Sequence, residues 1–268
     1  MRIGLVQTQI IWENRMENIE RAVKTIERQA KNGTELILFP EMSFTGFSMN
    51  TDATKESGEY TRGRMKEAAC ENDISIGYGW VKDCGEKCEN HYSVIDNKGN
   101  LISDYTKIHP FSYSGENEFF RGGERTVVFE LNGIKFATFI CYDLRFPEIF
   151  QAVSDEVSAI IVPANWPARR REHWKTLLKA RAIENQIYIL GINCVGNAGG
   201  MEYTGDSSIV NPNGDVMMLE NTGEGVLSYD LKDDTEEYRK DFRVRMDRKW
   251  NLYQRLYADL NNGGKLNV

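Results

Sequence analysis

The chain has 268 residues, of which 41% are hydrophobic and 27% charged, so its composition is that of a globular protein and excludes a disordered or fibrous one. The formal net charge of −7 disfavours a general nucleic-acid-binding surface and an anionic-membrane surface. The basic cluster at Arg169–Glu172 is interpreted as the solvated start of a helix.

The sequence also predicts no transmembrane helix, reduced cysteines and no zinc site. No stretch is long and apolar enough for a transmembrane helix, and the N-terminal residues alternate like a strand, unlike a secretion signal. The five cysteines are odd in number and widely spread, which is typical of reduced thiols in a cytoplasm. Cys84 and Cys88 resemble half of a zinc site, but no second pair with zinc spacing accompanies them, so we expect free surface thiols.

The N-terminal segment predicts a strand–helix–strand unit, beginning with a strand at 3–10. Apolar residues at helical spacing follow. Asn14 can cap this helix with Glu17 three residues further on, and the Asn-Gly pair at 32–33 ends it. The apolar run at 35–41 predicts a second strand because it is too short for a helix.

The rest of the chain repeats this alternation and adds hairpins. Asn-Gly pairs at 132–133 and 213–214 are hairpin signals, and a polar turn at 97–100 predicts a third hairpin. The further predicted strands are 74–81, 91–96, 101–107, 126–131, 134–143, 158–165, 187–194, 207–212, 215–219 and 223–231, and the further predicted helices are 147–154 and 172–185.

From about residue 233 the chain turns helical and polar, and it ends in a tail that carries aromatic residues. This tail could wrap its own molecule or a partner subunit. The alternation of strands and helices makes the chain an α/β protein, and no linker divides it. We therefore expect residues 1–268 to form a single domain.

Three polar residues directly follow apolar strands: Glu41, Cys141 and Asn165. Ligands of open α/β sheets bind beyond the carboxyl ends of the strands. All three are therefore candidate site residues by position.

Each candidate also has a non-catalytic interpretation. Cys141 at a strand-to-helix turn could be a nucleophile with the backbone N–H of Tyr142 as an oxyanion donor, or a small buried hydrophobic residue. Glu41 would be partly desolvated, which suits a general base, or it could be a strand-end acid in water. Lys107 could stabilise an oxyanion beside a carboxylate, or it could be an edge-strand lysine facing water.

Together these residues stand in motifs that resemble the nitrilase superfamily of carbon–nitrogen hydrolases. Glu41 ends FPE, Lys107 begins K-x-H-x-F and Cys141 begins CYDLRFPE, in the order and approximate spacing of that family. The resemblance extends over nearly the whole chain through PANWP at 163–167, ARAIENQIY at 180–188 and GDSSIVNPNG at 205–214.

The resemblance implies a four-layer α-β-β-α sandwich with mixed sheets and a Glu–Lys–Cys triad without metal or organic cofactor. Glu41 would take the thiol proton, Cys141 would attack the amide carbonyl, and Lys107 with the Tyr142 N–H would hold the oxyanion. Glu41 would then protonate the departing ammonia and activate the water that hydrolyses the thioester.

The resemblance has two further implications. Many members carry a second active-site glutamate, which falls here on Glu116, with Glu118 close enough to compete. Members also pair through their central helices. We therefore expect a homodimer or a higher even-numbered oligomer, with the tail from about 240 to 268 packing across the dimer.

Within the superfamily, the wording of K-I-H-P-F, S-G-E-N-E and CYDLRFPE is most similar to the omega-amidase branch. That branch hydrolyses the terminal amide of 2-oxoglutaramate or 2-oxosuccinamate to ammonia and a dicarboxylate. Arg145 could bind the far carboxylate of such a substrate, or it could pair locally with Asp143 or Glu148. Further candidates for substrate binding are Asn165 and Trp166.

Three alternatives stay open at this point. The chain could be another amidase of the superfamily, acting on deaminated glutathione, N-carbamoyl amines or aliphatic amides. It could be a Cys–His hydrolase that uses Cys141 with His109 or His173. It could also be a non-catalytic binding or assembly module.

Overall fold

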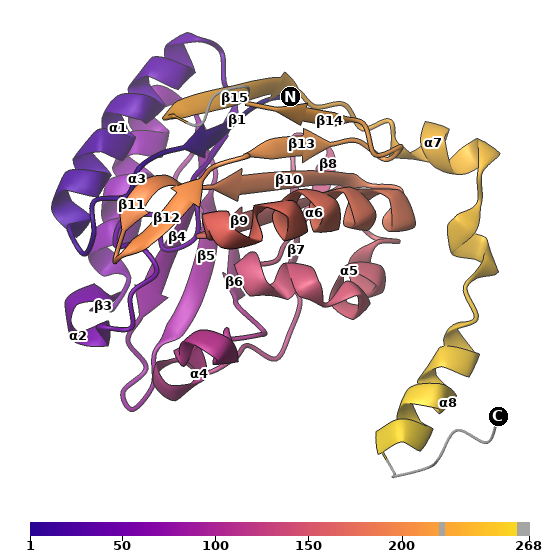
Figure 1. The fold of residues 1–268 in the computed structure, drawn as a ribbon. Coiled ribbons are helices and arrows are strands. Elements are labelled where there is room, and N and C mark those ends of the chain that lie inside the picture. The colour runs from indigo at the N-terminus through magenta and orange to yellow at the C-terminus, as the bar shows by residue number, and fades with distance from the viewer. Residues whose placement is uncertain (220–222, 262–268) are drawn as a thin grey trace.

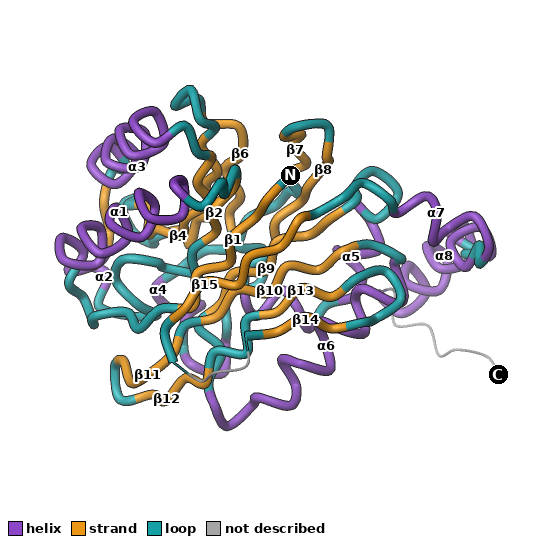
Figure 2. The backbone as a smooth tube through the Cα atoms, turned by 90° about the horizontal axis from the view of Figure 1, so that it is seen from above, coloured by secondary structure: helices purple, strands orange, loops and turns teal. Residues whose placement is uncertain are grey.

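Two mixed β-sheets face each other, and helices cover their outer sides (Figures 1 and 2). The structure is a computed structural model that describes residues 1–219 and 223–261. No helix among these residues is long and apolar enough to cross a membrane.

The first sheet has the strand order β15-β1-β2-β4-β5-β6, with β3 paired to β4. Strands β1, β2 and β4 are mutually parallel, whereas β15, β5 and β6 join the sheet antiparallel to their neighbours. The strands are β1 (Arg2–Gln7), β2 (Leu36–Leu38), β3 (Lys55–Glu56), β4 (Ser75–Lys82), β5 (Glu89–Ile95), β6 (Leu101–Thr106) and β15 (Gly225–Asp230).

The second sheet has the order β14-β13-β10-β9-β8-β7, with β8, β9 and β10 parallel. Its strands are β7 (Val128–Leu131), β8 (Ile134–Thr138), β9 (Ala159–Ala164), β10 (Tyr188–Asn193), β13 (Ser208–Val210) and β14 (Val216–Met218). A separate hairpin is formed by β11 (Val195–Ala198) and β12 (Met201–Thr204).

The helices complete four layers, with α1 and α3 outside the first sheet and α5 and α6 outside the second (Figure 2). The α-helices are α1 (Arg15–Lys31), α2 (Thr51–Thr54), α3 (Glu59–Asn72), α4 (Glu116–Phe119), α5 (Pro147–Val153), α6 (Arg171–Asn185), α7 (Thr235–Asp241) and α8 (Trp250–Asn261). Short 3₁₀ helices are η1 (Ser112–Ser114), η2 (Cys141–Arg145), η3 (Ala168–Arg170) and η4 (Val244–Asp247). The predicted α-β-β-α sandwich is confirmed.

Side-chain alternation along the strands divides the core into two parts. On β1, Ile3 and Leu5 point into the space between the two sheets, whereas Val6 packs with α1 and α3. On β2, Leu36 and Leu38 face the second sheet and Ile37 faces the helices. Because successive side chains leave a strand on opposite faces, a strand that is apolar throughout can be buried on both sides.

Local signals in the sequence are also confirmed. The Asn14 side chain accepts a hydrogen bond from the Glu17 N–H and caps α1. Asn132 and Gly133 both have positive φ, 50° and 79°, as the two central residues of a type I′ hairpin turn require. Pro147 begins α5, where its missing N–H costs no helical bond.

Some predictions were wrong or incomplete. Helix α3 and the β11–β12 hairpin were not predicted, and the first strand ends at Gln7, short of Ile10. Cys88 is not a surface thiol: it is buried in a small apolar cluster with Met42 and Phe120, while Cys84 is half-buried. The polar residues next to Cys88 in sequence do not reveal this burial, because Met42 and Phe120, which cover the thiol, are distant in sequence.

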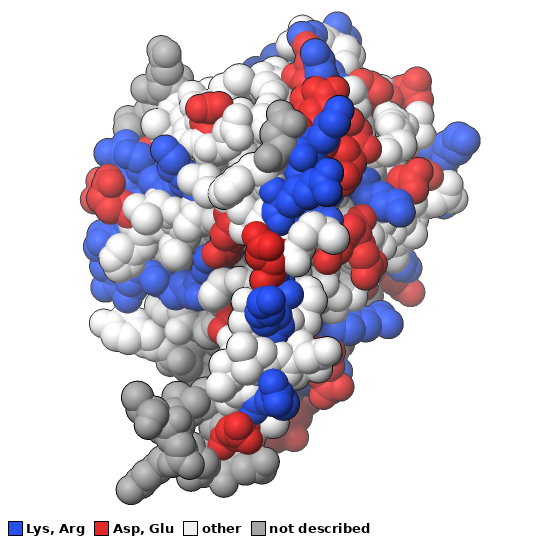
Figure 3. Space-filling model, turned by 90° about the vertical axis from the view of Figure 1, so that its right-hand side faces the viewer, with Lys and Arg blue, Asp and Glu red and all other residues white. Residues whose placement is uncertain are grey.

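The C-terminal helix α8 projects from the sandwich in both ribbon views (Figures 1 and 2), whereas α7 is tied to the sandwich, because Arg239 donates to the carbonyl oxygens of Ser154 and Val157. The face that carries these two helices shows positive and negative side chains interspersed with uncharged ones (Figure 3). Large apolar side chains on α8 are exposed: Trp250, Leu252, Leu256 and Tyr257. The last seven residues of the predicted tail, 262–268, lie outside the described residues.

Candidate active site

The ends of strands from both sheets bring the candidate residues together. Glu41 follows β2 and Lys107 follows β6 in the first sheet, whereas Cys141 follows β8 and Asn165 follows β9 in the second. Contacts among these four residues join segments up to 124 residues apart in sequence. The site therefore lies where the two sheets meet at the ends of their strands.

A buried ion cluster lies at the centre of this site. The Lys107 ammonium donates to Glu41 Oε1 at 2.8 Å and to Glu116 Oε2 at 2.9 Å. All three side chains are at most 1% exposed. Glu118 is exposed, so the structure places Glu116 and not Glu118 in the cluster.

Burial and charge shift the pKa values of this cluster in definite directions. Burial opposes the charged form of Lys107, but the carboxylates of Glu116 and Glu41 outweigh it and raise its pKa above the usual value. For Glu116, burial outweighs the nearby ammonium and raises the pKa of the carboxyl. The two carboxylates therefore favour the charged form of Lys107, whose ammonium is buried among their oxygen atoms.

Asn90 is a member of the cluster that sequence reasoning missed. Its side-chain amide donates to Glu41 Oε1 at 2.9 Å and to Glu116 Oε1 at 3.3 Å. The amide oxygen Oδ1 is buried and has no hydrogen-bond partner in the structure. Asn90 lies on β5, and no local pattern around it indicates that this strand borders the site.

Asn165 ties Glu41 to the second sheet. Its backbone N–H donates to Glu41 Oε2 at 2.9 Å, and its side-chain amide donates to the Glu41 carbonyl oxygen at 2.6 Å. The Asn165 side-chain oxygen in turn accepts from the thiol of Cys194 at 3.2 Å. Asn165 thus contacts Glu41 in addition to lining the cavity described below.

Cys141 begins η2 in a left-handed backbone conformation, with φ of +46°. A residue other than glycine rarely adopts this conformation, and such strained turns are concentrated at functional sites. Burial raises the pKa of the Cys141 thiol well above its usual value, and the neighbouring Glu41 carboxylate adds to the rise. Tyr142 supplies an N–H in the first turn of η2, where backbone donors have no partner inside the helix.

The buried carboxylate of Asp143 braces the turn that carries the thiol. It accepts hydrogen bonds from the Ile140 N–H at 3.0 Å, the Tyr105 hydroxyl at 2.8 Å and the His109 ring at 2.7 Å. The His109 ring also stacks on Phe146, with 3.7 Å between centroids. His109 therefore contacts Asp143, which supports the turn that carries Cys141, and does not contact Cys141 itself.

Arg145 does not make either of the local ion pairs that the sequence allowed. Asp143 is occupied as described, and Glu148 is exposed. The Arg145 guanidinium instead lies 4.9 Å from the Trp166 ring centroid and contacts His173 Nδ1 at 3.2 Å. It lines a cavity of about 60 Å³ whose wall also includes Cys141.

The basic cluster that follows Trp166 is less solvated than predicted. Arg169 is exposed, but Arg170 is half-buried and lines the same cavity as Cys141. Arg171 is also half-buried and pairs with Asp206 at 2.7 Å. The predicted helix start is confirmed, because η3 leads directly into α6, but the prediction that the cluster is solvated was wrong for Arg170, which lines the cavity.

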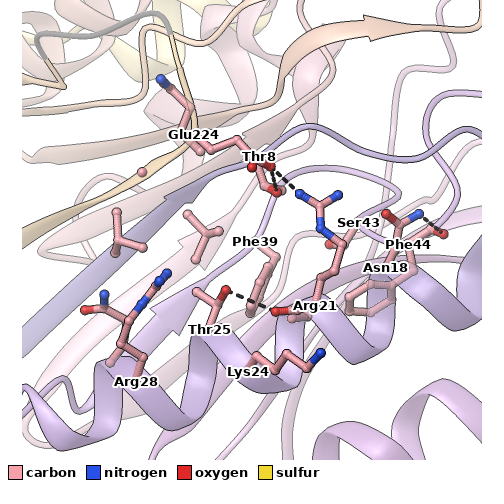
Figure 4. A pocket seen from close by; sticks show the side chains of 16 residues that line it. Thr8, Asn18, Arg21, Lys24, Thr25, Arg28, Phe39, Ser43, Phe44 and Glu224 are labelled. Carbon is pink, nitrogen blue, oxygen red and sulfur yellow. Dashed lines mark hydrogen bonds and ion pairs between the residues drawn. The ribbon is translucent and has the colours of Figure 1, made fainter.

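A larger cavity of about 530 Å³ lies elsewhere, between α1 and the strands β1 and β15. Figure 4 shows Arg21, Lys24 and Arg28 of α1 along one side, with Glu224 opposite and in contact with Arg21. None of the residues that line it belongs to the Glu41–Lys107–Cys141 cluster. The larger of these two cavities is therefore not the one that contains the candidate catalytic residues.

The described residues contain no group of three or more His, Cys, Asp or Glu side chains arranged to hold a metal ion. The donor set around Cys141 offers one ammonium, two carboxylates and amide groups. Such a set suits proton transfer and oxyanion stabilisation by side chains.

This fold and this site define a hydrolase of carbon–nitrogen bonds. A family model described as "Carbon-nitrogen hydrolase" matches residues 2–240, and the chain belongs to that family. The family resemblance of the sequence motifs is thereby confirmed.

Similar proteins and a similar solved structure support this family membership. The chain is 32% identical to a 2-oxoglutaramate amidase of Bacillus subtilis over 256 residues, 94% of this chain and 98% of the relative. It is 32% identical to the omega-amidase YafV of Escherichia coli over 218 residues, 81% of this chain and 84% of the relative. The structure of XC1258 from Xanthomonas campestris, a CN-hydrolase superfamily protein with an arsenic adduct in its active site, superimposes with a TM-score of 0.87 at 26% identity, covering 93% of this chain and 97% of that one.

Proposed function

We propose that this protein is an omega-amidase. It would hydrolyse the terminal carboxamide of a small omega-amido-2-oxo acid, such as 2-oxoglutaramate or 2-oxosuccinamate, to ammonia and a dicarboxylate. The observation that carries the proposal is one cavity in which Cys141 and Arg145 both line the wall, with the ion cluster of Glu41 and Lys107 beside the thiol. The names of the relatives from B. subtilis and E. coli support the same substrate class.

In the proposed mechanism, Glu41 accepts the thiol proton as Cys141 Sγ attacks the amide carbon. A general base is needed because the buried thiol has a raised pKa and stays protonated at neutral pH. The tetrahedral oxyanion is stabilised by the Lys107 ammonium and the Tyr142 N–H. Glu41 delivers the proton to the amide nitrogen, the C–N bond breaks, and ammonia leaves a thioester.

Hydrolysis of the thioester completes the cycle. Glu41 accepts a proton from a water molecule as that water attacks the thioester carbon, and the same donors stabilise the second oxyanion. The C–S bond then breaks, the thiol regains its proton, and the carboxylic acid is released. We assign Glu116 the role of orienting Lys107, and Asn165 and Trp166 the role of shaping the cavity.

The test is a screen for released ammonia. Purified protein is incubated with 2-oxoglutaramate, 2-oxosuccinamate, deaminated glutathione, an N-carbamoyl amine and a simple aliphatic amide, with Cys141→Ala as the control. We expect the two omega-amido-2-oxo acids to give the highest kcat/KM. If deaminated glutathione or the carbamoyl compound is preferred, the omega-amidase assignment is wrong, although the amidase chemistry stands.

We also propose that the protein works in the cytoplasm as a homodimer or a larger even-numbered oligomer, with its tail packed on a second copy. The exposed apolar side chains of α8 support this assembly, because a helix with such a face is stabilised when another surface covers it. The mixed charges on this face are compatible with pairing to another copy (Figure 3).

A further inference from the structure

The wall of the cavity at Cys141 has an unbalanced charge. Three of the described residues that line it are arginines, Arg145, Arg169 and Arg170, and none of the described residues that line it is acidic. This is unusual in a chain whose net charge is −7. Because the charged side chains among these lining residues are all cationic, the cavity favours an anion as its occupant.

Arg170 is the arginine of this cavity with a buried nitrogen atom that lacks a hydrogen-bond partner. Its Nη1 atom is buried and has no hydrogen-bond partner in the structure. Its guanidinium lies 5.3 Å from the Phe111 ring centroid and 5.0 Å from the Tyr113 ring centroid, so aromatic rings hold it in place. Buried N–H groups usually have an acceptor, and since Arg170 also lines the cavity that Cys141 lines, a ligand in that cavity can supply one to Nη1.

Arg145 and Arg170 also act on each other. Burial first, and the charge of Arg170 second, lower the pKa of the Arg145 guanidinium. The two like charges therefore repel each other, and both side chains line the same cavity. Among the described residues, the side chain of Arg145 contacts the Trp166 ring and His173, neither of which carries a formal negative charge.

We propose that Arg145 and Arg170 bind one substrate carboxylate between them, and that Arg170 makes the enzyme select amides with a far carboxylate over neutral amides of the same length. A carboxylate would supply the missing acceptor at Nη1 and relieve the repulsion between the two guanidinium groups. The cavity of about 60 Å³ requires that the amide and the carboxylate be separated by a short chain. The proposal rests on the amidase function proposed above for the Cys141 end of the cavity.

The test compares glutaramate, which carries the carboxylate, with pentanamide, a neutral amide of the same number of carbons. Wild-type protein is expected to favour glutaramate in kcat/KM. In Arg170→Gln the ratio of the two kcat/KM values should fall by about 10- to 100-fold, the usual effect of losing a charge-assisted hydrogen bond. Arg170→Lys keeps the charge but not the planar fork, and should give an intermediate ratio.

The matched control is Arg125→Gln, which removes the same charge from an exposed residue outside this cavity and should leave the ratio unchanged. Glutarate competition gives a second measure that does not need turnover: its inhibition constant should rise by about 10- to 100-fold in Arg170→Gln. Circular dichroism verifies that each variant is folded.

Two failures can be told apart. If wild-type protein does not favour glutaramate over pentanamide, the proposed omega-amidase function falls, and the role of Arg170 falls with it. If wild-type protein favours glutaramate but Arg170→Gln keeps the same ratio and the same glutarate inhibition, the proposal for Arg170 alone is overturned.

Discussion

Asn165 holds Glu41 at two points, through its backbone N–H to the carboxylate at 2.9 Å and through its side-chain amide to the carbonyl oxygen at 2.6 Å. The two residues belong to different sheets, so this contact sets the position of the proposed base relative to the proposed nucleophile. Asn165→Ala removes the side-chain bond and retains the backbone bond. We expect kcat to fall by about 10- to 100-fold with KM changed less than about threefold, because the lost bond orients the base and not the substrate. Steady-state kinetics of ammonia release test this, and a rise in KM alone would contradict it.

The Glu–Lys–Cys and Cys–His mechanisms make opposite predictions for His109. Since His109 contacts Asp143 and not the thiol, His109→Asn should keep activity within about tenfold of wild type. Glu41→Gln preserves the size of the side chain but cannot accept the thiol proton, so kcat should fall by about a thousandfold or more. The measurement is kcat for 2-oxoglutaramate, with thermal unfolding as the check on folding. A severe loss in His109→Asn with an active Glu41→Gln would support the Cys–His mechanism instead.

Glu116 and Glu118 form a natural pair for comparison, because they lie two residues apart on α4 and only the first is buried. Glu116→Gln removes one carboxylate from the Lys107 ammonium, so we expect kcat/KM to fall by about 10- to 100-fold. The variant should also be less stable, because breaking a buried ion pair leaves a charge poorly compensated. Glu118→Gln is the control and should change kcat/KM by less than about twofold. Equal effects of the two substitutions would show that burial in the cluster does not matter for catalysis.

The state of the thiol can be read from its alkylation rate as a function of pH. Because burial raises the pKa of Cys141, its thiolate fraction at neutral pH lies below that of free cysteine, whose pKa is about 8.5. Alkylation by iodoacetamide should therefore be slow at pH 7 and should still increase with pH above 9. Peptide mass spectrometry after timed labelling distinguishes Cys141 from the other four thiols. A rate that is already constant between pH 6 and pH 8 would mean that the thiolate is preformed.

The tail offers a test of assembly. Removing residues 250–268 deletes α8 with its exposed apolar side chains and leaves the two sheets intact. If α8 packs on a second copy, sedimentation should show a shift toward a smaller species, while the far-ultraviolet spectrum of the sandwich is retained. An unchanged mass in solution would place the subunit contacts elsewhere, on the sandwich itself.

Much of the fold was predictable from local patterns. Runs such as Leu36–Leu38 are short and apolar throughout, and Asn-Gly pairs mark turns whose positive φ angles few other residues adopt. The same strand ends pointed to Glu41, Cys141 and Asn165, since polar residues directly after buried strands lie at one edge of a sheet. These inferences succeed because backbone geometry and side-chain periodicity act over a few residues.

Other features were settled only by tertiary structure, because they depend on which distant segments meet. The chain alone left Glu116 and Glu118 as competitors, and burial against Lys107 separates them. It gave no sign that Asn90 would bridge two carboxylates from β5. Arg145 has two acidic neighbours in sequence, and either could have paired with it. In the structure the Asp143 carboxylate instead accepts hydrogen bonds from Tyr105 and His109, and the Arg145 side chain lines the cavity. Local sequence specifies the types of chemical group and the strands that carry them, whereas the packing of the two sheets brings the buried charges of these groups together, where their interactions are strong.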